Sequence, residues 1–149
     1  MNEAPTKQDA GLHLPSLPAD VTPPRLLRAV TPTYPPAQQY GGIQGCAWIG
    51  YDISEEGKPI NLRVLLSAPI RDFGAAALGT MSQWRFIPAV KDGHPIRIEH
   101  TAQLFLYRLS GTGIQPMPDC SFPGTHASRS EGIDTTSASG YGRRLIDLK

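Results

Sequence analysis

Candidate catalytic and metal-binding residues are few and are scattered along the chain. The four histidines and two cysteines match no zinc-ligand spacing, so we expect no metal and no bound cofactor. Asp52, Glu55 and Glu56 are close in sequence, but they fall at the tip of an expected hairpin. Such a group is usually a solvated turn rather than a general acid and base. No phosphate-binding loop, nucleophile elbow or dinucleotide fingerprint occurs, so we predict that the protein is not an enzyme.

The two cysteines leave two interpretations open. Cys46 is expected on a strand, and Cys120 lies in a C-terminal segment that could reach it. An oxidising compartment would then permit a disulfide between them. Equally, both could remain unpaired thiols, with Cys46 as a small filler of its strand, because nothing in the spacing requires a bond.

Charge and hydropathy exclude several kinds of partner. The chain carries 14 Lys+Arg against 13 Asp+Glu, a formal net charge of +1, which gives no reason to expect nucleic acid or an anionic membrane surface. No run approaches the roughly 18 apolar residues of a membrane-spanning helix, and the first ten residues lack the features of a signal peptide. As given, the sequence is expected to be soluble and to carry no targeting signal.

Proline and glycine divide the chain into three parts. More than half of the 15 prolines precede residue 37, so we predict an extended leader over residues 1–29 that acts as a linker. Residues 111–149 begin with a stretch rich in Gly, Ser and Thr without an apolar period, which predicts a flexible tail. The compact domain is therefore expected over residues 30–110.

The apolar periods within that domain alternate between helix and strand. Alternation predicts one apolar face on each strand, and Phe73, Ala77, Met81 and Trp84 form one helical stripe. We therefore predict an α+β fold, a three-stranded antiparallel sheet with two helices packed on one face and water on the other. In chain order the expected elements are a short helix within residues 33–42, strands over 46–53 and 60–66 joined by a turn at 54–58, a helix over 71–84 and a long strand over 96–109.

The two sides of the long last strand differ in character. Its even positions are mostly apolar and are expected to face the core, with His100 half-buried among them. Its odd positions are expected to face solvent, and they end in two aromatic residues that suggest a contact surface. These odd positions are Arg97, Glu99, Thr101, Gln103, Phe105 and Tyr107.

Seven short elements then occur in an order that resembles the C-terminal domain of the TonB family, across residues 31–109. Each is weak alone, but their common order and spacing are specific. They are Tyr34-Pro35 with Ala37, the Gly42-Ile43-Gln44-Gly45 run, the hairpin 52–57, Leu66-Ser67-Ala68-Pro69, Phe73 with Ala76-Ala77, Trp84-Arg85-Phe86-x-Pro88-Ala89 and Asp92-Gly93-x-Pro95.

The resemblance implies a periplasmic energy-transducing module that supports active import. Such a module binds the N-terminal box peptide of outer-membrane transporters as an added strand beside its own last strand, here residues 97–107. The resemblance also places Thr31 and Tyr34 at the peptide, with Thr31-Pro32 where relatives often have Gln-Pro. An exposed strand edge of this kind also predicts a homodimer through edge strands.

The sequence as given shows no inner-membrane anchor helix and no long Pro/Glu/Lys-rich spacer. Two expectations follow. Either the natural protein is longer, and its anchor contacts inner-membrane motor proteins, or the domain is a stand-alone periplasmic scaffold or other cell-envelope interaction protein with the same fold.

Overall fold

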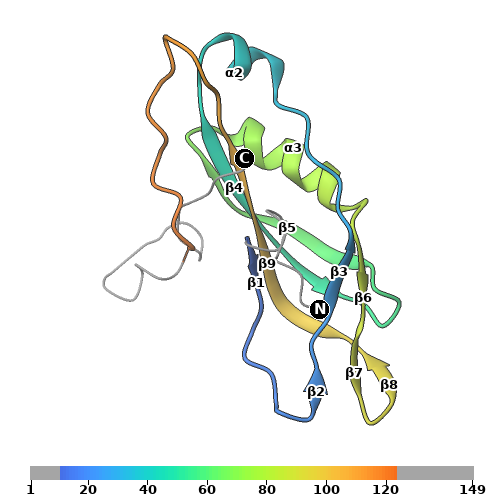
Figure 1. Cartoon of the computed structure of the whole chain (residues 1–149). Helices are drawn as coiled ribbons and strands as arrows, with labels where there is room; N and C mark the ends of the chain where they lie inside the picture. Colours follow the sequence, from blue (N-terminus) through green and yellow to red (C-terminus); the bar gives the residue numbers. More distant parts are fainter. Residues whose placement is uncertain (1–10, 124–149) are drawn as a thin grey trace.

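A four-stranded antiparallel sheet forms the centre of the computed structural model, which describes residues 11–123 (Figure 1). The strand order is β1-β9-β4-β5, so β9 lies between β1 and β4. The bounds are Leu12–His13 for β1, Gly45–Ile53 for β4, Pro59–Ala68 for β5 and Ile98–Tyr107 for β9.

Two smaller sheets extend from one end of this sheet (Figure 1). They have the orders β2-β7-β8 and β3-β6, with β2 at Val21–Thr22, β3 at Arg25–Arg28, β6 at Arg85–Ile87, β7 at Ala89–Lys91 and β8 at His94–Ile96. The described part of the predicted leader is therefore extended, but it pairs with β9, β7 and β6 instead of forming a free linker.

The β4–β5 hairpin has the turn that the sequence predicts. Gly57 takes a φ of 85°, a left-handed conformation that favours glycine, and the Ser54 hydroxyl accepts the N–H groups of Glu56 and Lys58. Two bulges interrupt the ladder, between Trp48 and Ile49 and again before Asp52. Because each bulge moves later residues to the other face, the predicted alternation along residues 60–66 is wrong.

Both predicted helices are present, so the α+β antiparallel architecture is confirmed. Helix α2 (Pro36–Tyr40) buries no residue, whereas α3 (Arg71–Met81) lies across β4 and β5 (Figure 1). Its predicted stripe is buried, although the helix ends before Trp84, which follows in a turn. Among residues 11–123, neither helix has the length and apolar character needed to span a membrane.

The main core lies between α3 and the sheet. It combines alternate residues of β4 with the buried side of α3, the Trp84–Phe86 segment and the end of β9. Its buried members are Ala47, Ile49, Tyr51, Ile53, Phe73, Ala77, Met81, Trp84, Phe86, Phe105 and Tyr107.

The opposite face of the sheet is also covered, so the predicted wet face is wrong. A second cluster buries Cys46, Trp48, Ala102, Leu106 and Cys120. Its cover comes from residues 114–123, which lie within the predicted flexible tail; the rest of that tail, 124–149, lies outside the described residues. This cover could not be predicted from a hydrophobic period, because the segment has no regular secondary structure.

Because both faces of the sheet are covered, the predicted solvent-facing side of β9 is also wrong. The odd residues Thr101, Gln103, Phe105 and Tyr107 point into the protein rather than into solvent, each 1–2% exposed. His100 is exposed instead of half-buried. A bulge between the pairs Tyr51–Thr101 and Ile53–Ile98 changes the register here, and His100 has a φ of 65° within it.

Candidate functional site

The outer side of β9 is the edge at which the family resemblance predicts an added peptide strand. Within the described residues, β1 pairs with this side through two residues only, Leu12 opposite Gln103 and His13 opposite Ala102. The other side of β9 pairs with β4 along almost its whole length. The candidate edge is therefore partly occupied by a short segment of the same chain.

The hydrogen bonds show which residues of β9 face that edge. The Leu104 N–H donates to the Gly11 carbonyl at 3.0 Å, so it points toward β1. Since backbone groups alternate along a strand, the even residues of 101–107 direct their N–H groups outward and the odd residues direct theirs toward β4. A peptide at this edge would meet the backbone of Ala102, Leu104 and Leu106.

Three odd candidate residues of β9 have buried side chains that form hydrogen bonds and hold the strand in place. The Thr101 hydroxyl donates to the Tyr51 carbonyl at 2.5 Å, and the Tyr107 hydroxyl donates to the Phe73 carbonyl at 3.2 Å. Burial raises the pKa of Tyr107, and the neighbouring Tyr34 adds to that effect. The Gln103 amide nitrogen donates to the Leu104 carbonyl at 3.1 Å. These side chains hold β9 in place, and with β1 paired they are almost fully buried.

Thr31 and Tyr34 differ in their surroundings. Thr31 is exposed. The Tyr34 hydroxyl donates to the Ile43 carbonyl at 2.5 Å, and its ring meets Phe73 and Tyr107 edge to face, with centroids 5.7 and 5.5 Å away. Burial raises the pKa of the Tyr34 phenol. Tyr34 thus joins the segment before α2 to the end of β9.

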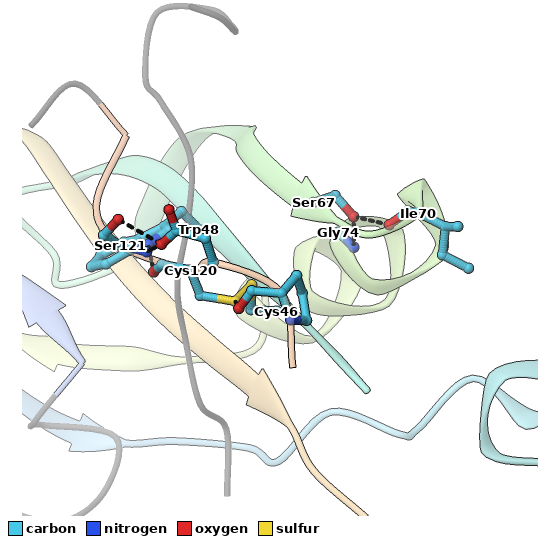
Figure 2. The surroundings of a disulfide bond; sticks show 9 residues. Cys46, Trp48, Ser67, Ile70, Gly74, Cys120 and Ser121 are labelled. Atoms are coloured by element: carbon cyan, nitrogen blue, oxygen red, sulfur yellow. Dashed lines mark hydrogen bonds between the residues drawn. A yellow bond between two sulfur atoms is a disulfide. The ribbon is translucent and has the colours of Figure 1, made fainter. Parts of the chain in front are cut away.

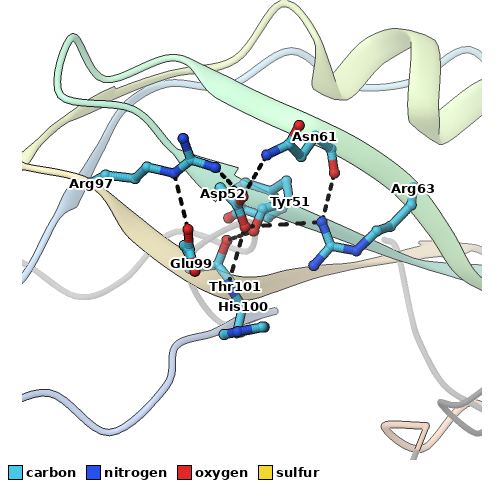
Figure 3. A network of polar contacts seen from close by, with 8 residues as sticks. All are labelled: Tyr51, Asp52, Asn61, Arg63, Arg97, Glu99, His100 and Thr101. Carbon is cyan, nitrogen blue, oxygen red and sulfur yellow. Dashed lines mark hydrogen bonds and ion pairs between the residues drawn. The ribbon is translucent and has the colours of Figure 1, made fainter.

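Arg97 and Glu99 belong to a polar cluster before the regular part of β9 (Figure 3). The Arg97 guanidinium lies 3.3 Å from the Glu99 carboxylate and donates to Asp52 at 3.0 Å. Asp52 also accepts hydrogen bonds from Asn61 at 2.7 Å and from the His100 N–H at 3.2 Å. The cluster joins β4, β5 and β9, so its evident role is structural.

Asp52 is only 6% exposed, which makes its charge dependent on these partners. Burial alone would raise its pKa, but the bonds from Asn61, the His100 N–H and Arg97, with the nearby Arg63 charge, hold the pKa below its ordinary value. A carboxyl whose pKa is lower in the folded state stabilises the fold above its unfolded pKa, near 4. This stabilisation disappears as the pH falls through the folded-state pKa.

We expect Asp52→Asn to lower the free energy of unfolding at pH 7 by about 1–3 kcal/mol, because buried hydrogen bonds to a charge are lost. The deficit should shrink below about pH 4, where the wild-type carboxyl also becomes protonated. Urea unfolding at pH 7, 5 and 3 measures both effects. Asp20→Asn is the matched control, since Asp20 is exposed and its ion pair with Lys91 is long, at 3.9 Å. A pH-independent deficit would argue against a charge-based role for Asp52.

The structure joins Cys46 and Cys120 in a disulfide, with Cα atoms 6.2 Å apart (Figure 2). Beside it, the Trp48 indole N–H donates to the Cys120 carbonyl at 3.1 Å. Trp48 and Phe122 pack edge to face, with ring centroids 4.8 Å apart. Sequence reasoning did not connect these rings, although each follows a cysteine by two residues, the spacing that places side chains on one face of an extended chain.

No group of three metal-ligating side chains is found between residues 11 and 123. What the β9 edge offers chemically is main-chain pairing along one strand, with side chains of a partner alternating between the two covered faces of the sheet. The predicted homodimer through such an edge stays a prediction.

Comparisons with known proteins agree on one family. A model of the family described as Gram-negative bacterial TonB protein C-terminal matches residues 30–109. Protein TonB of Yersinia enterocolitica is 32% identical over 83 residues, which are 56% of this chain and 32% of that protein. Protein TonB of Pseudomonas aeruginosa is 30% identical over 102 residues, which are 68% of this chain and 30% of that protein.

The fold has a counterpart among solved structures. The solution NMR structure of the Pseudomonas aeruginosa TonB CTD matches with a TM-score of 0.51 and 27% sequence identity, covering 63% of this chain and 91% of that one. The chain spans about a third of the length of the curated relatives named above.

Proposed function

The chain belongs to the family of Gram-negative bacterial TonB C-terminal domains, and from that premise we propose that it is the periplasmic receptor-binding module of an energy transducer. In this proposal it captures the N-terminal box peptide of an outer-membrane transporter and so supports active import. The peptide adds as a strand on the outer side of β9.

The observation that carries this proposal is the contrast between the two sides of β9. The side toward β4 is paired almost throughout, whereas the described partner on the outer side is a strand of two residues. Such a short strand contributes few main-chain hydrogen bonds, so a longer peptide can replace it and gain more. The buried odd side chains fix β9 in position, which lowers the conformational cost of adding a strand.

Titration of the isotope-labelled chain with a synthetic box peptide tests the proposal by NMR. We expect the amide shifts to cluster on residues 98–107 and 11–13, because the peptide replaces β1. Shifts confined to the hairpin turn at 54–58, or no shifts at saturating peptide, would contradict binding at β9.

A pair of proline variants tests which N–H groups the peptide uses. Leu106→Pro removes an outward N–H that no described residue of β1 accepts, and we expect peptide binding to weaken about fivefold while the fold survives, since a net hydrogen bond contributes about 1 kcal/mol. Gln103→Pro is the matched control. Its N–H points toward β4, so this change should break the central ladder and lower the melting temperature. Equal peptide affinity in wild type and Leu106→Pro would contradict the assigned edge.

A further inference from the structure

The segment beside β9 shows what the edge accepts. The two residues of β1 lie opposite Gln103 and Ala102, and the preceding Gly11 accepts a hydrogen bond from the Leu104 N–H. This three-residue segment makes the type of contact that an added peptide strand would make. Its side chains therefore report the preferences of the edge at three successive positions.

The two side chains of β1 go to opposite faces of the sheet. Leu12 packs against the main core. The His13 ring lies on the second face, where it stacks on Phe122 with centroids 4.1 Å apart and ring planes at 18°. Trp48 meets the His13 ring edge-on, with centroids 6.4 Å apart and ring planes at 90°. One face of the edge thus receives an aliphatic side chain and the other receives a flat ring.

Trp48 and Phe122 form a ring socket that is built without help from β1. The two rings contact each other, and Trp48 is hydrogen-bonded to the Cys120 carbonyl. The disulfide ties Cys120 to Cys46, two residues before Trp48 on β4 (Figure 2). Because a hydrogen bond holds the Trp48 ring and the disulfide ties down the backbone two residues before Phe122, an occupant has less to order on arrival.

Two further features limit which residues a strand beside β9 can carry. Partial burial against the rings of the socket lowers the pKa of the His13 imidazole, although the residue as a whole is exposed. A Cβ atom on Gly11 would lie 2.7 Å from the Gln103 amide nitrogen and 2.9 Å from the Leu104 carbonyl oxygen. The position before the apolar residue therefore favours the smallest side chain.

We propose that the ring socket is a specificity site for the incoming strand and that residues 11–13 are its intramolecular occupant. This inference rests on the proposed peptide-binding function. A strand that adds in the orientation of β1 is preferred when it carries, in order, glycine, an apolar residue and a flat-ring residue. The ring residue lies opposite Ala102, and the peptide competes with residues 11–13 for the edge.

Three synthetic peptides test the preference. Each has ten residues, a Thr/Val background and a central Gly-Leu-Phe, Gly-Leu-His or Gly-Leu-Ser. With the full chain at pH 7.5, we expect the Phe and His peptides to bind about 2- to 10-fold more tightly than the Ser peptide, the size of one aromatic pair. Affinities come from NMR titration of the β9 amides, which also report the binding place.

Three variants separate the parts of the proposal. Phe122→Leu keeps an apolar side chain but removes the ring, so it should abolish the difference between the Phe and Ser peptides. Tyr40→Leu is the matched control, because Tyr40 is an aromatic side chain on α2 that is 93% exposed, and it should leave the difference intact. His13→Ser should tighten binding of all three peptides about 2- to 10-fold by weakening the internal occupant.

The outcomes distinguish this inference from the proposed function. If all three peptides shift β9 with equal affinity in wild type and in Phe122→Leu, the socket is not a specificity site, although strand addition stands. If His13→Ser leaves all affinities unchanged, residues 11–13 are not a competing occupant. If no peptide shifts β9 in wild type or in His13→Ser, strand addition itself is wrong, and this inference falls with it.

Discussion

Breaking the Cys46–Cys120 disulfide should lower the free energy of unfolding by about 4 kcal/mol. The two cysteines are separated by 74 residues, and a cross-link over a loop of that size removes much entropy from the unfolded chain. Domains of this size usually have a stability of about 5–15 kcal/mol, so the bond would account for a large share of it.

Guanidinium unfolding of oxidised Cys120→Ser against oxidised wild type measures this loss. Adding a reductant should destabilise the wild type to the level of the variant and leave the variant unchanged. Cys46→Ser/Cys120→Ser is the matched control, and it should behave like Cys120→Ser because the second thiol has no partner to lose. Mass spectrometry of protein purified from an oxidising compartment provides an independent check. Two alkylatable thiols, together with an unchanged melting temperature in Cys120→Ser, would contradict the prediction.

The same variant should also affect the second face of the sheet. Without the bond, Cys120 and Phe122 are held over β4 mainly by the Trp48 hydrogen bond and by packing. We therefore expect the His13 ring to lose its stacking partner for part of the time, with a visible change in its imidazole NMR signals. The disulfide thus supports both the stability of the domain and the ring socket.

The fold was predictable where one local pattern decides the structure. The alternation through residues 46–53, the glycine at the 54–58 turn and the apolar stripe of α3 each identify one element, and the structure has all of them. Their order also carried the family resemblance, which the family match over residues 30–109 confirms.

The second face was not predictable in the same way. Its cover is an irregular segment, held by one disulfide and a few side chains, so it has no period to detect. Polar residues on β9 made the error worse, since Thr101 and Gln103 are typical of a solvent-facing strand. In the structure each of these two side chains donates a hydrogen bond to a carbonyl, which lets it be buried.

The candidate edge shows a related limit. β1 has two residues, too few for any alternation to be detected. Its pairing with β9 depends on contacts between residues that are far apart in the sequence. The sequence pattern predicted β9 as a strand, and the family resemblance suggested that a peptide would add beside it. They did not reveal the segment that already lies beside it.

Trp84→Ala should lower the free energy of unfolding by about 3–5 kcal/mol, the usual cost of removing a large buried aromatic side chain. Trp84 is fully buried, its ring lies near Phe86 and Phe105, and its indole N–H donates to the Val30 carbonyl at 2.9 Å. The change therefore leaves a cavity behind β9 and also releases the segment that leads from β3 to α2.

Trp84→Phe separates these two contributions. It keeps a ring in the core but leaves the Val30 carbonyl without its donor, so we expect a loss of about 1–3 kcal/mol, smaller than that of Trp84→Ala. Tyr40→Ala is the control for loss of an exposed aromatic and should change stability by less than about 0.5 kcal/mol. Urea unfolding measures all three, and equal losses in Trp84→Ala and Tyr40→Ala would contradict a core role. Because the Phe105 ring packs against Trp84, Trp84→Ala should also reduce hydrogen-exchange protection along β9 and weaken peptide binding there, although Trp84 itself is fully buried.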